Sequence, residues 1–182
     1  MKSLISDKVY GFILMLFGIT GLASTASIHI EKAKIAEDAK YQTICTINET
    51  FSCNDVMASW QASTFGFPNT YIGFVGFGIT IAIGLLYLLS TRIFSEKTPP
   101  QWILWGNLVG FTLAMAFVFF LAHAAIFEIH ALCIFCMIIW FSVNFLLFST
   151  VSKIFKYTHV QNLILISIMV ALFTGVMFYE LG

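Results

Sequence analysis

The four cysteines of this 182-residue chain fall into two pairs. Cys45 and Cys53 lie in a polar stretch, and Cys133 and Cys136 form a C-I-F-C motif at the start of an apolar segment. Paired thiols suit thiol–disulfide exchange, in which two electrons move through a mixed disulfide. A CxxC motif at a helix start also lies near unpaired backbone amides, which favour the reactive thiolate. The cysteines therefore predict a relay in which the loop pair exchanges electrons with the second pair.

Two other interpretations of the cysteines stay open. The loop pair can form a structural disulfide while the C-I-F-C pair packs as small apolar side chains. Alternatively, two or more cysteines bind a metal ion together with His29, His123 or His130. These histidines lie near the ends of apolar segments, however, where anchoring at the membrane interface also explains them.

Composition places these cysteines in a membrane protein, because 59% of the residues are apolar and 10% are charged. A formal net charge of zero argues against a nucleic-acid partner, since no basic excess is present to neutralise phosphates. A bilayer is crossed by roughly 20 apolar residues, and five stretches approach that length: 9–28, 70–89, 102–121, 132–151 and 162–179. We expect an all-α membrane protein, a four-helix transmembrane bundle plus a fifth transmembrane helix, forming one integral membrane domain over residues 1–182.

Basic residues predict how the chain lies in the membrane. A cytoplasmic N-terminus leaves three lysines outside, Lys32, Lys34 and Lys40, and six basic residues inside, Lys2, Lys8, Arg92, Lys97, Lys153 and Lys156. This distribution follows the positive-inside rule, and it places all four cysteines on the outer side, where disulfides persist. A cleavable signal peptide is the alternative for the first stretch, but its roughly 20 apolar residues exceed the ~7 to 15 of a signal-peptide core.

The polar loop 30–69 is expected to cap the bundle on the outer side. Its start, residues 31–40, mixes Lys and acidic residues with Ala and Ile and favours a short helix that continues from the membrane. Its turn-rich end can place Phe65 and Phe67 at the interface above the bundle.

Small and amide side chains within the spans predict contacts between helices. We expect close helix packing at five glycines: Gly73, Gly76, Gly78 and the Gly106–Gly110 GxxxG motif. Asn107 and Asn144 are expected to form hydrogen bonds between helices.

The arrangement resembles the vitamin K epoxide reductase family, whose members carry a loop cysteine pair after the first span and a CxxC motif at the outer end of the fourth. The resemblance covers residues 45–140. Ser59 falls where the family has Ser or Thr, and Asn69, in N-T-Y-I-G, resembles the family's quinone-binding Asn. Trp140 departs from the pattern, because vertebrate members have a Tyr there that donates a hydrogen bond to the quinone, although Trp also offers an N–H donor. The fifth span is similar to that of the prokaryotic branch.

This resemblance implies an enzyme, a quinone-dependent thiol–disulfide oxidoreductase that supports disulfide bond formation. Cys45 and Cys53 would accept electrons from a separate, DsbA-like thioredoxin-fold protein, and Cys133 and Cys136 would reduce a membrane quinone: ubiquinone, menaquinone or vitamin K. No metal is expected. The implied location is the inner membrane of a bacterial or archaeal cell. Two alternatives are a vitamin K quinone or epoxide reductase and a non-catalytic, tetraspan-like membrane protein with a structural loop disulfide.

The same resemblance assigns expected quinone contacts. Asn69 would donate a hydrogen bond to the quinone carbonyl, although an Asn at this boundary can also cap a helix. Ser59 either contacts the quinone or caps a short helix. Phe65, Phe67 and Trp140 would supply apolar walls.

Overall fold

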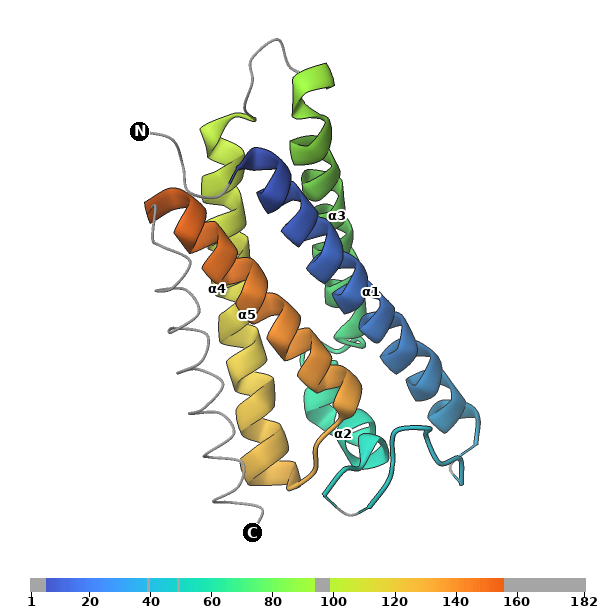
Figure 1. Cartoon of the computed structure of the whole chain (residues 1–182). Helices are drawn as coiled ribbons and strands as arrows, with labels where there is room; N and C mark the ends of the chain where they lie inside the picture. Colours follow the sequence, from blue (N-terminus) through green and yellow to red (C-terminus); the bar gives the residue numbers. More distant parts are fainter. Residues whose placement is uncertain (1–5, 39, 49, 94–98, 156–182) are drawn as a thin grey trace.

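The structure is a computed structural model that describes residues 6–38, 40–48, 50–93 and 99–155. Within these residues all regular structure is helical. Four segments are long and apolar enough to cross a membrane: α1 (Asp7–Glu37), α3 (Thr70–Ile93), α4 (Gln101–His123) with its π-helical continuation η2 (Ala124–Ile129), and α5 (Ile134–Phe155). They form an elongated bundle (Figure 1). The all-α membrane fold is confirmed, and the predicted fifth span lies outside the described residues.

Helix α1 extends well beyond its predicted span. The Ser6 hydroxyl accepts a hydrogen bond from the Val9 amide and begins the helix, and Asp7 in the first turn suits the positive end of its dipole. Its 31 residues correspond to a length of about 46 Å, whereas the hydrocarbon core of a bilayer is about 30 Å thick. The last turns therefore reach past the membrane, which confirms the helix predicted at the start of the outer loop.

The long helices pack unequally. Helix α1 packs along α3 and α5, and α4 packs along α5, whereas α3 and α4 make little direct contact with each other. A Cβ added at Gly73 would lie 2.8 Å from Thr25 Oγ1, so the predicted close packing at this glycine is confirmed. The same prediction is wrong for Gly76, Gly78 and the GxxxG motif, where an added Cβ would meet nothing within 4 Å. These glycines lie on α3 and α4, at places where no neighbouring helix covers them.

A buried polar cluster joins three helices at the end of the bundle that holds the start of α1. Lys153 Nζ lies 2.7 Å from Asp7 Oδ1. The hydroxyls of Tyr10 and Thr150 lie 2.8 Å apart, and Asn107 Nδ2 donates to Tyr10 Oη over 3.1 Å. The predicted bond of Asn107 between helices is thereby confirmed.

Asn144 behaves differently from Asn107. Its Nδ2 donates to the carbonyl of Trp140 within α5, over 3.1 Å, and its Oδ1 is buried without a partner among the described residues. The prediction that Asn144 bonds between helices is therefore wrong. Its side chain finds the carbonyl four residues earlier in its own helix, a local alternative that the spacing alone did not exclude.

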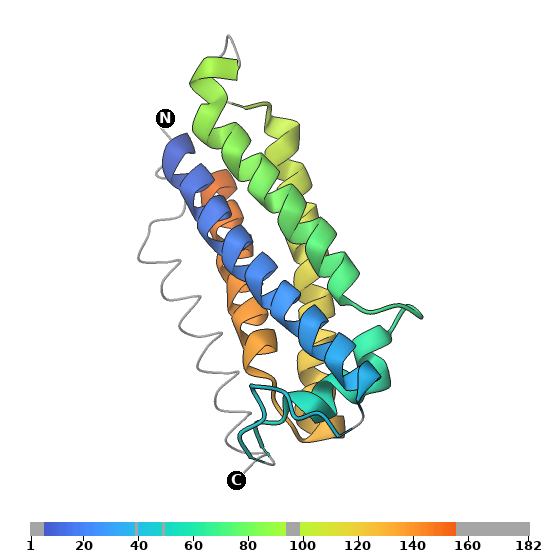
Figure 2. The same cartoon turned by 90° about the vertical axis from the view of Figure 1, so that its right-hand side faces the viewer.

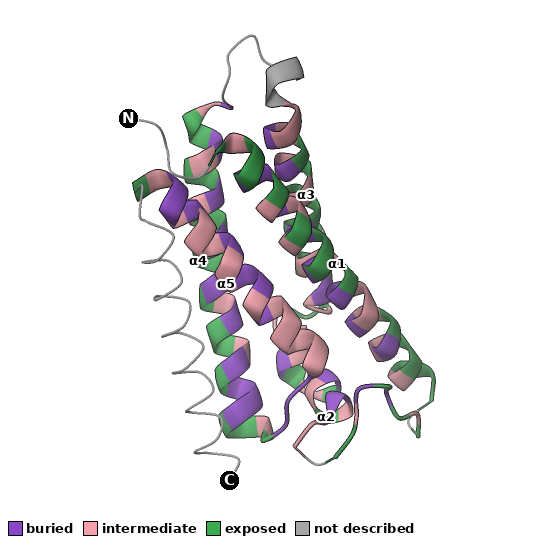
Figure 3. Cartoon of the chain, in the orientation of Figure 1, coloured by how far each residue is buried: buried purple, intermediate pink, exposed green. Residues whose placement is uncertain are grey.

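The opposite end of the bundle carries the loop, with the short helices α2 (Cys53–Ala58) and η1 (Trp60–Ser63). Figures 1 and 2 both place α2 beside the end of α1 and the turn between η2 and α5. The loop therefore caps one end of the bundle, as predicted. Exposed residues occur along α1, α3 and α4, whereas α5 is buried or half-buried as far as its last residue, Phe155 (Figure 3). The exposed residues include large apolar side chains such as Phe12, Val75 and Leu113, which suits contact with lipid.

Candidate functional site

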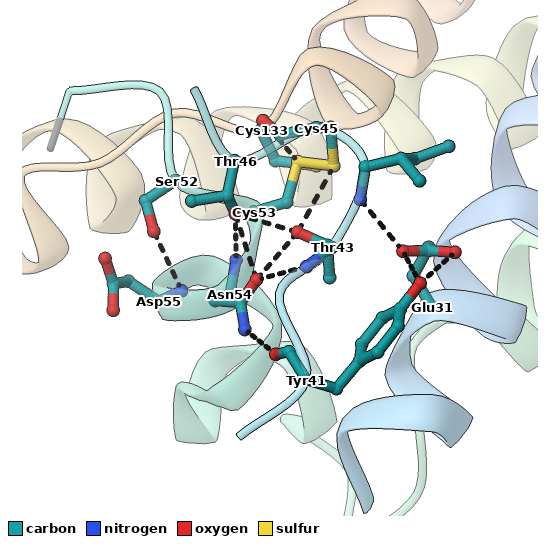
Figure 4. The surroundings of a disulfide bond; sticks show 11 residues. Glu31, Tyr41, Thr43, Cys45, Thr46, Ser52, Cys53, Asn54, Asp55 and Cys133 are labelled. Atoms are coloured by element: carbon teal, nitrogen blue, oxygen red, sulfur yellow. Dashed lines mark hydrogen bonds between the residues drawn. A yellow bond between two sulfur atoms is a disulfide. The ribbon is translucent and has the colours of Figure 1, made fainter. Parts of the chain in front are cut away.

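The two cysteine pairs meet at the capped end of the bundle. Cys45 and Cys53 form a disulfide with a Cα–Cα distance of 5.7 Å. Cys133 and Cys136 are free, and Cys133 Sγ lies 3.2 Å from Cys53 Sγ (Figure 4). The three sulfurs of Cys45, Cys53 and Cys133 are buried, with exposed fractions of 4%, 0% and 0% for their residues. A disulfide and a free thiol from distant parts of the chain are thus in contact, which is the arrangement that exchange requires.

Local structure brings these sulfurs together. Cys53 begins α2, where the Ser52 hydroxyl accepts a hydrogen bond from the Asp55 amide. On the other side, η2 ends at His130 in the left-handed conformation with φ 55°, which turns the chain before α5. The amide of Leu132 then donates to the Thr50 carbonyl over 2.8 Å and fastens the residue before Cys133 to the loop. Helix α5 begins at Ile134, two residues after the predicted start of this span, so Cys133 precedes the helix and Cys136 lies in its first turn.

Glu31 fastens the start of the loop to the end of α1. Its buried carboxylate accepts a hydrogen bond from Lys34 Nζ over 2.9 Å. It also accepts hydrogen bonds from the Ile44 amide over 3.2 Å and from the Tyr41 hydroxyl over 3.1 Å, the latter visible in Figure 4. Because Ile44 directly precedes Cys45, this carboxylate positions the backbone on one side of the disulfide.

Asn54 fastens the loop from the other side of the disulfide. Its Oδ1 accepts hydrogen bonds from the amide and the hydroxyl of Thr43, over 2.8 and 2.7 Å, and from the Thr46 hydroxyl over 2.9 Å. Its Nδ2 donates to the Tyr41 carbonyl over 2.7 Å (Figure 4). Sequence analysis missed both Asn54 and Glu31. Asn next to Cys53 gave a weak signal, since Asn often bonds to nearby backbone, whereas the partners of Glu31 depend on how the loop folds back.

The Cys133 thiol has a lowered pKa. Hydrogen bonds from the Cys136 thiol, and from the backbone amides of Cys136 and Phe135, lower the pKa of the Cys133 thiol, although burial opposes them. A lower pKa favours the thiolate, the species that attacks a disulfide. Within this pair the hydrogen bonds thus favour the thiolate at the sulfur beside Cys53, and the backbone amides at the helix start contribute as predicted.

A cavity of about 920 Å³ begins at these thiols and runs between α3 and α4. Its walls are mostly apolar and include Cys133, Cys136 and four of the five residues expected to contact a quinone, namely Ser59, Phe65, Asn69 and Trp140. Phe67 is not among the lining residues and packs on Phe65, with ring centroids 6.2 Å apart. Gly76, Gly106 and Gly110 also line the cavity, which explains why an added Cβ meets nothing there.

Asn69 and Ser59 both bond to nearby backbone. Asn69 Nδ2 donates to the Gln61 carbonyl over 2.6 Å, and its Oδ1 accepts from the Thr64 amide over 3.2 Å. Asn69 therefore fastens the turn above the cavity rather than capping α3 with its side chain. The Ser59 hydroxyl donates to the Val56 carbonyl over 2.8 Å and caps the end of α2, the alternative that sequence analysis kept open.

The histidines considered as metal ligands lie apart from the sulfurs. Within the described part of the chain, the one group of potential ligands is Cys45, Cys53 and Cys133, whose sulfurs lie within 4.8 Å of one another. The disulfide occupies two of these three sulfurs. His29 Nδ1 lies 3.0 Å from Thr70 Oγ1, and the His123 ring packs on Phe127 at 4.7 Å. These two rings thus contact Thr70 and Phe127 rather than the sulfurs.

Comparison with known proteins extends these observations. A search of curated proteins found no match. A family model described as Vitamin K epoxide reductase family matches residues 12–151, a segment that contains both cysteine pairs and the whole cavity-lining set. The match covers more than half of the chain. The described part of the chain has the four apolar helices and the loop disulfide expected from the resemblance. The chain therefore belongs to the vitamin K epoxide reductase family.

Proposed function

We propose that this chain is a membrane thiol:quinone oxidoreductase, which oxidises the dithiol of a thioredoxin-fold partner and reduces a membrane quinone. Family membership and the Cys45–Cys53 disulfide support a redox role. The observation that carries the finer proposal is the 3.2 Å distance between Cys53 Sγ and Cys133 Sγ, at the end of a large apolar cavity. The product, an oxidised partner, would introduce disulfides into other proteins on the outer side of the membrane.

The cycle begins with both cysteine pairs oxidised. A thiolate of the partner attacks Cys45 Sγ, so that a Cys45–partner bond forms, the Cys45–Cys53 bond breaks and Cys53 leaves as a thiolate. Cys53 then attacks Cys133 Sγ, which forms a Cys53–Cys133 bond and releases Cys136. Because the sulfurs of Cys53 and Cys133 lie in contact, this second transfer needs little motion.

Two further exchanges return the loop to its starting state. The second thiolate of the partner attacks the sulfur joined to Cys45, so the partner leaves oxidised and Cys45 leaves as a thiolate. Cys45 attacks Cys53, restores the loop disulfide and releases Cys133. Across the four exchanges, two electrons and two protons pass from the partner dithiol to the pair Cys133 and Cys136. The resulting state, a loop disulfide with two free thiols, is that of the structure.

In the last step, Cys133 and Cys136 give two electrons and two protons to one quinone, which yields a quinol and a Cys133–Cys136 disulfide. Both thiols line the cavity, and its apolar walls suit an apolar ring and tail. Asn69 Nδ2 has a second N–H beyond the one bonded to Gln61, and this N–H can stabilise negative charge on a carbonyl oxygen. Electron flow in this direction keeps even a strongly oxidising partner, at about −120 mV, in its oxidised state.

The test is quinone-dependent oxidation of a reduced thioredoxin-fold protein by the purified chain, with ubiquinone, menaquinone and vitamin K. We expect turnover with at least one quinone, and loss to background when each of the four cysteines is replaced by Ala. Ser149→Ala is the matched control, because Ser149 lies in α5 but does not line the cavity. No turnover with any quinone, or turnover that survives the cysteine replacements, contradicts the proposal. Vitamin K epoxide as an added substrate tests the alternative reductase activity.

A further inference from the structure

Gln61 is a buried polar residue at the end of the cavity nearest the thiols. It lies in η1, is 5% exposed and lines the cavity. Its Nε2 donates to Glu128 Oε2 over 2.6 Å, while its Oε1 is buried without a hydrogen-bond partner in the described part of the chain. Buried polar atoms are nearly always hydrogen-bonded, so an acceptor left open beside a cavity indicates a ligand that completes it.

Two contacts hold Gln61 in place, one on its side-chain amide and one on its main chain. Rotating it by half a turn would bring Oε1 against the Glu128 carboxylate, which also accepts hydrogen bonds, so the charge of Glu128 keeps the N–H group on its own side. The backbone carbonyl of Gln61 is bonded to Asn69 Nδ2 over 2.6 Å, which holds the main chain as well. Gln61 therefore keeps an acceptor, rather than a donor, without a partner on the side of its amide away from Glu128, in a residue that lines the cavity.

We propose that Gln61 Oε1 accepts a hydrogen bond from a hydroxyl of the reduced ligand, a hydroquinone, and that Gln61 thereby sets the preference of the site for the reduced head group. This proposal rests on the function proposed above. A quinone carbonyl has only lone pairs and is repelled by an open acceptor, whereas a hydroquinone hydroxyl can donate to it. Binding the reduced form more tightly makes electron transfer from Cys133 and Cys136 more favourable within the site. Glu128, which acts through Gln61, is a positioning residue.

The test compares the affinity of the site for hydroquinone with its affinity for quinone. In the full-length protein, inhibition by added hydroquinone and the KM for quinone are measured for wild type and for Gln61→Met, which keeps the length of the side chain and removes the amide. We expect the inhibition constant for hydroquinone to rise about tenfold, the effect of one buried hydrogen bond, with the KM for quinone unchanged or lower. Gln101→Met is the control, since Gln101 is exposed at the far end of α4 and outside the cavity lining.

Glu128 variants test the orientation of the amide without altering Gln61. Glu128→Ala should weaken hydroquinone inhibition, because the amide can then rotate. Glu128→Gln should restore inhibition only in part, because its amide can accept a hydrogen bond from Nε2 but can also donate one to Oε1. These variants also decide the question if Gln61→Met does not fold. The role of Gln61 is overturned if these variants keep normal turnover and change the inhibition constant for hydroquinone and the KM for quinone equally, or change neither. Absence of turnover in wild type instead overturns the proposed oxidoreductase function.

Discussion

Around Cys45 and Cys53, hydrogen bonds centred on Glu31 and Asn54 fasten the loop on both sides of the disulfide, whereas the space between α3 and α4 is bounded mainly by apolar side chains and bare glycines. In the proposed function, the first region meets a protein partner that approaches from water and the second holds a quinone dissolved in lipid. They meet through one sulfur contact, Cys53 with Cys133. In the proposed function, electrons rather than ligands pass from one region to the other through this contact.

Cys53→Ala breaks the link between the regions and has the largest expected effect. Quinone-dependent turnover should fall to background, because no thiol then passes electrons from Cys45 to Cys133. The free Cys45 should attack the disulfide of the oxidised partner and form a Cys45–partner bond, which acid quenching preserves because Cys53 is gone and only the partner's own second thiolate can still break it. Electrophoresis without reductant detects this adduct. Cys45→Ala is the control and should give no adduct at this position; an adduct of equal amount would contradict the assigned order.

Gly106→Leu alters the cavity alone. A Leu side chain would enter the space between α3 and α4, so the KM for a long-tailed quinone should rise about tenfold, and that for a tailless quinone should rise less. Gly78→Leu is the matched control, because Gly78 also has open space around it but does not line the cavity. Steady-state kinetics provide the comparison. Equal changes in the two variants would mean that the tail does not lie between α3 and α4.

Glu31→Gln loosens the loop alone. It removes the charge that strengthens three hydrogen bonds, so the rate at which a reduced partner opens the Cys45–Cys53 disulfide should rise about fivefold. Stopped-flow mixing without quinone measures this rate. Glu37→Gln, an exposed change in the same helix, should leave it unchanged. A slower opening in Glu31→Gln would show that the hydrogen bonds assist the partner instead of restraining the loop.

The smallest expected effect is a difference between Cys136→Ser and Cys136→Ala in the pH at which the Cys133 thiolate forms. The hydrogen bond from Cys136 is the largest cause of the lowered pKa of Cys133, and Ser keeps a donor there while Ala does not. The Cys133 thiolate should therefore form at lower pH in Cys136→Ser than in Cys136→Ala. Ultraviolet absorbance of the thiolate, followed in a pH titration, measures both midpoints. If both variants titrate at the same pH, the backbone amides are the main cause of the lowered pKa of Cys133.

Sequence analysis predicted the features that depend on local composition. The four described spans, the extension of α1 past the membrane and the pairing of the loop cysteines follow from runs of apolar residues and from cysteine spacing. Lipid offers no hydrogen-bond partners, so an apolar run of sufficient length has almost no alternative to a membrane-spanning helix. Such predictions require no knowledge of which helix lies beside which.

Only the tertiary structure decided which side chains face one another. Gly73 packs closely on α1, but Gly106 faces open space, although both glycines lie in apolar helices and look alike in the sequence. Gln61 and Glu128 are separated by 67 residues, and no motif in the sequence marks either of them; the turn above the cavity places them in contact. Packing contacts and buried hydrogen bonds join residues far apart in the chain, and their partners are determined by how the helices are arranged around the cavity, not by neighbouring residues.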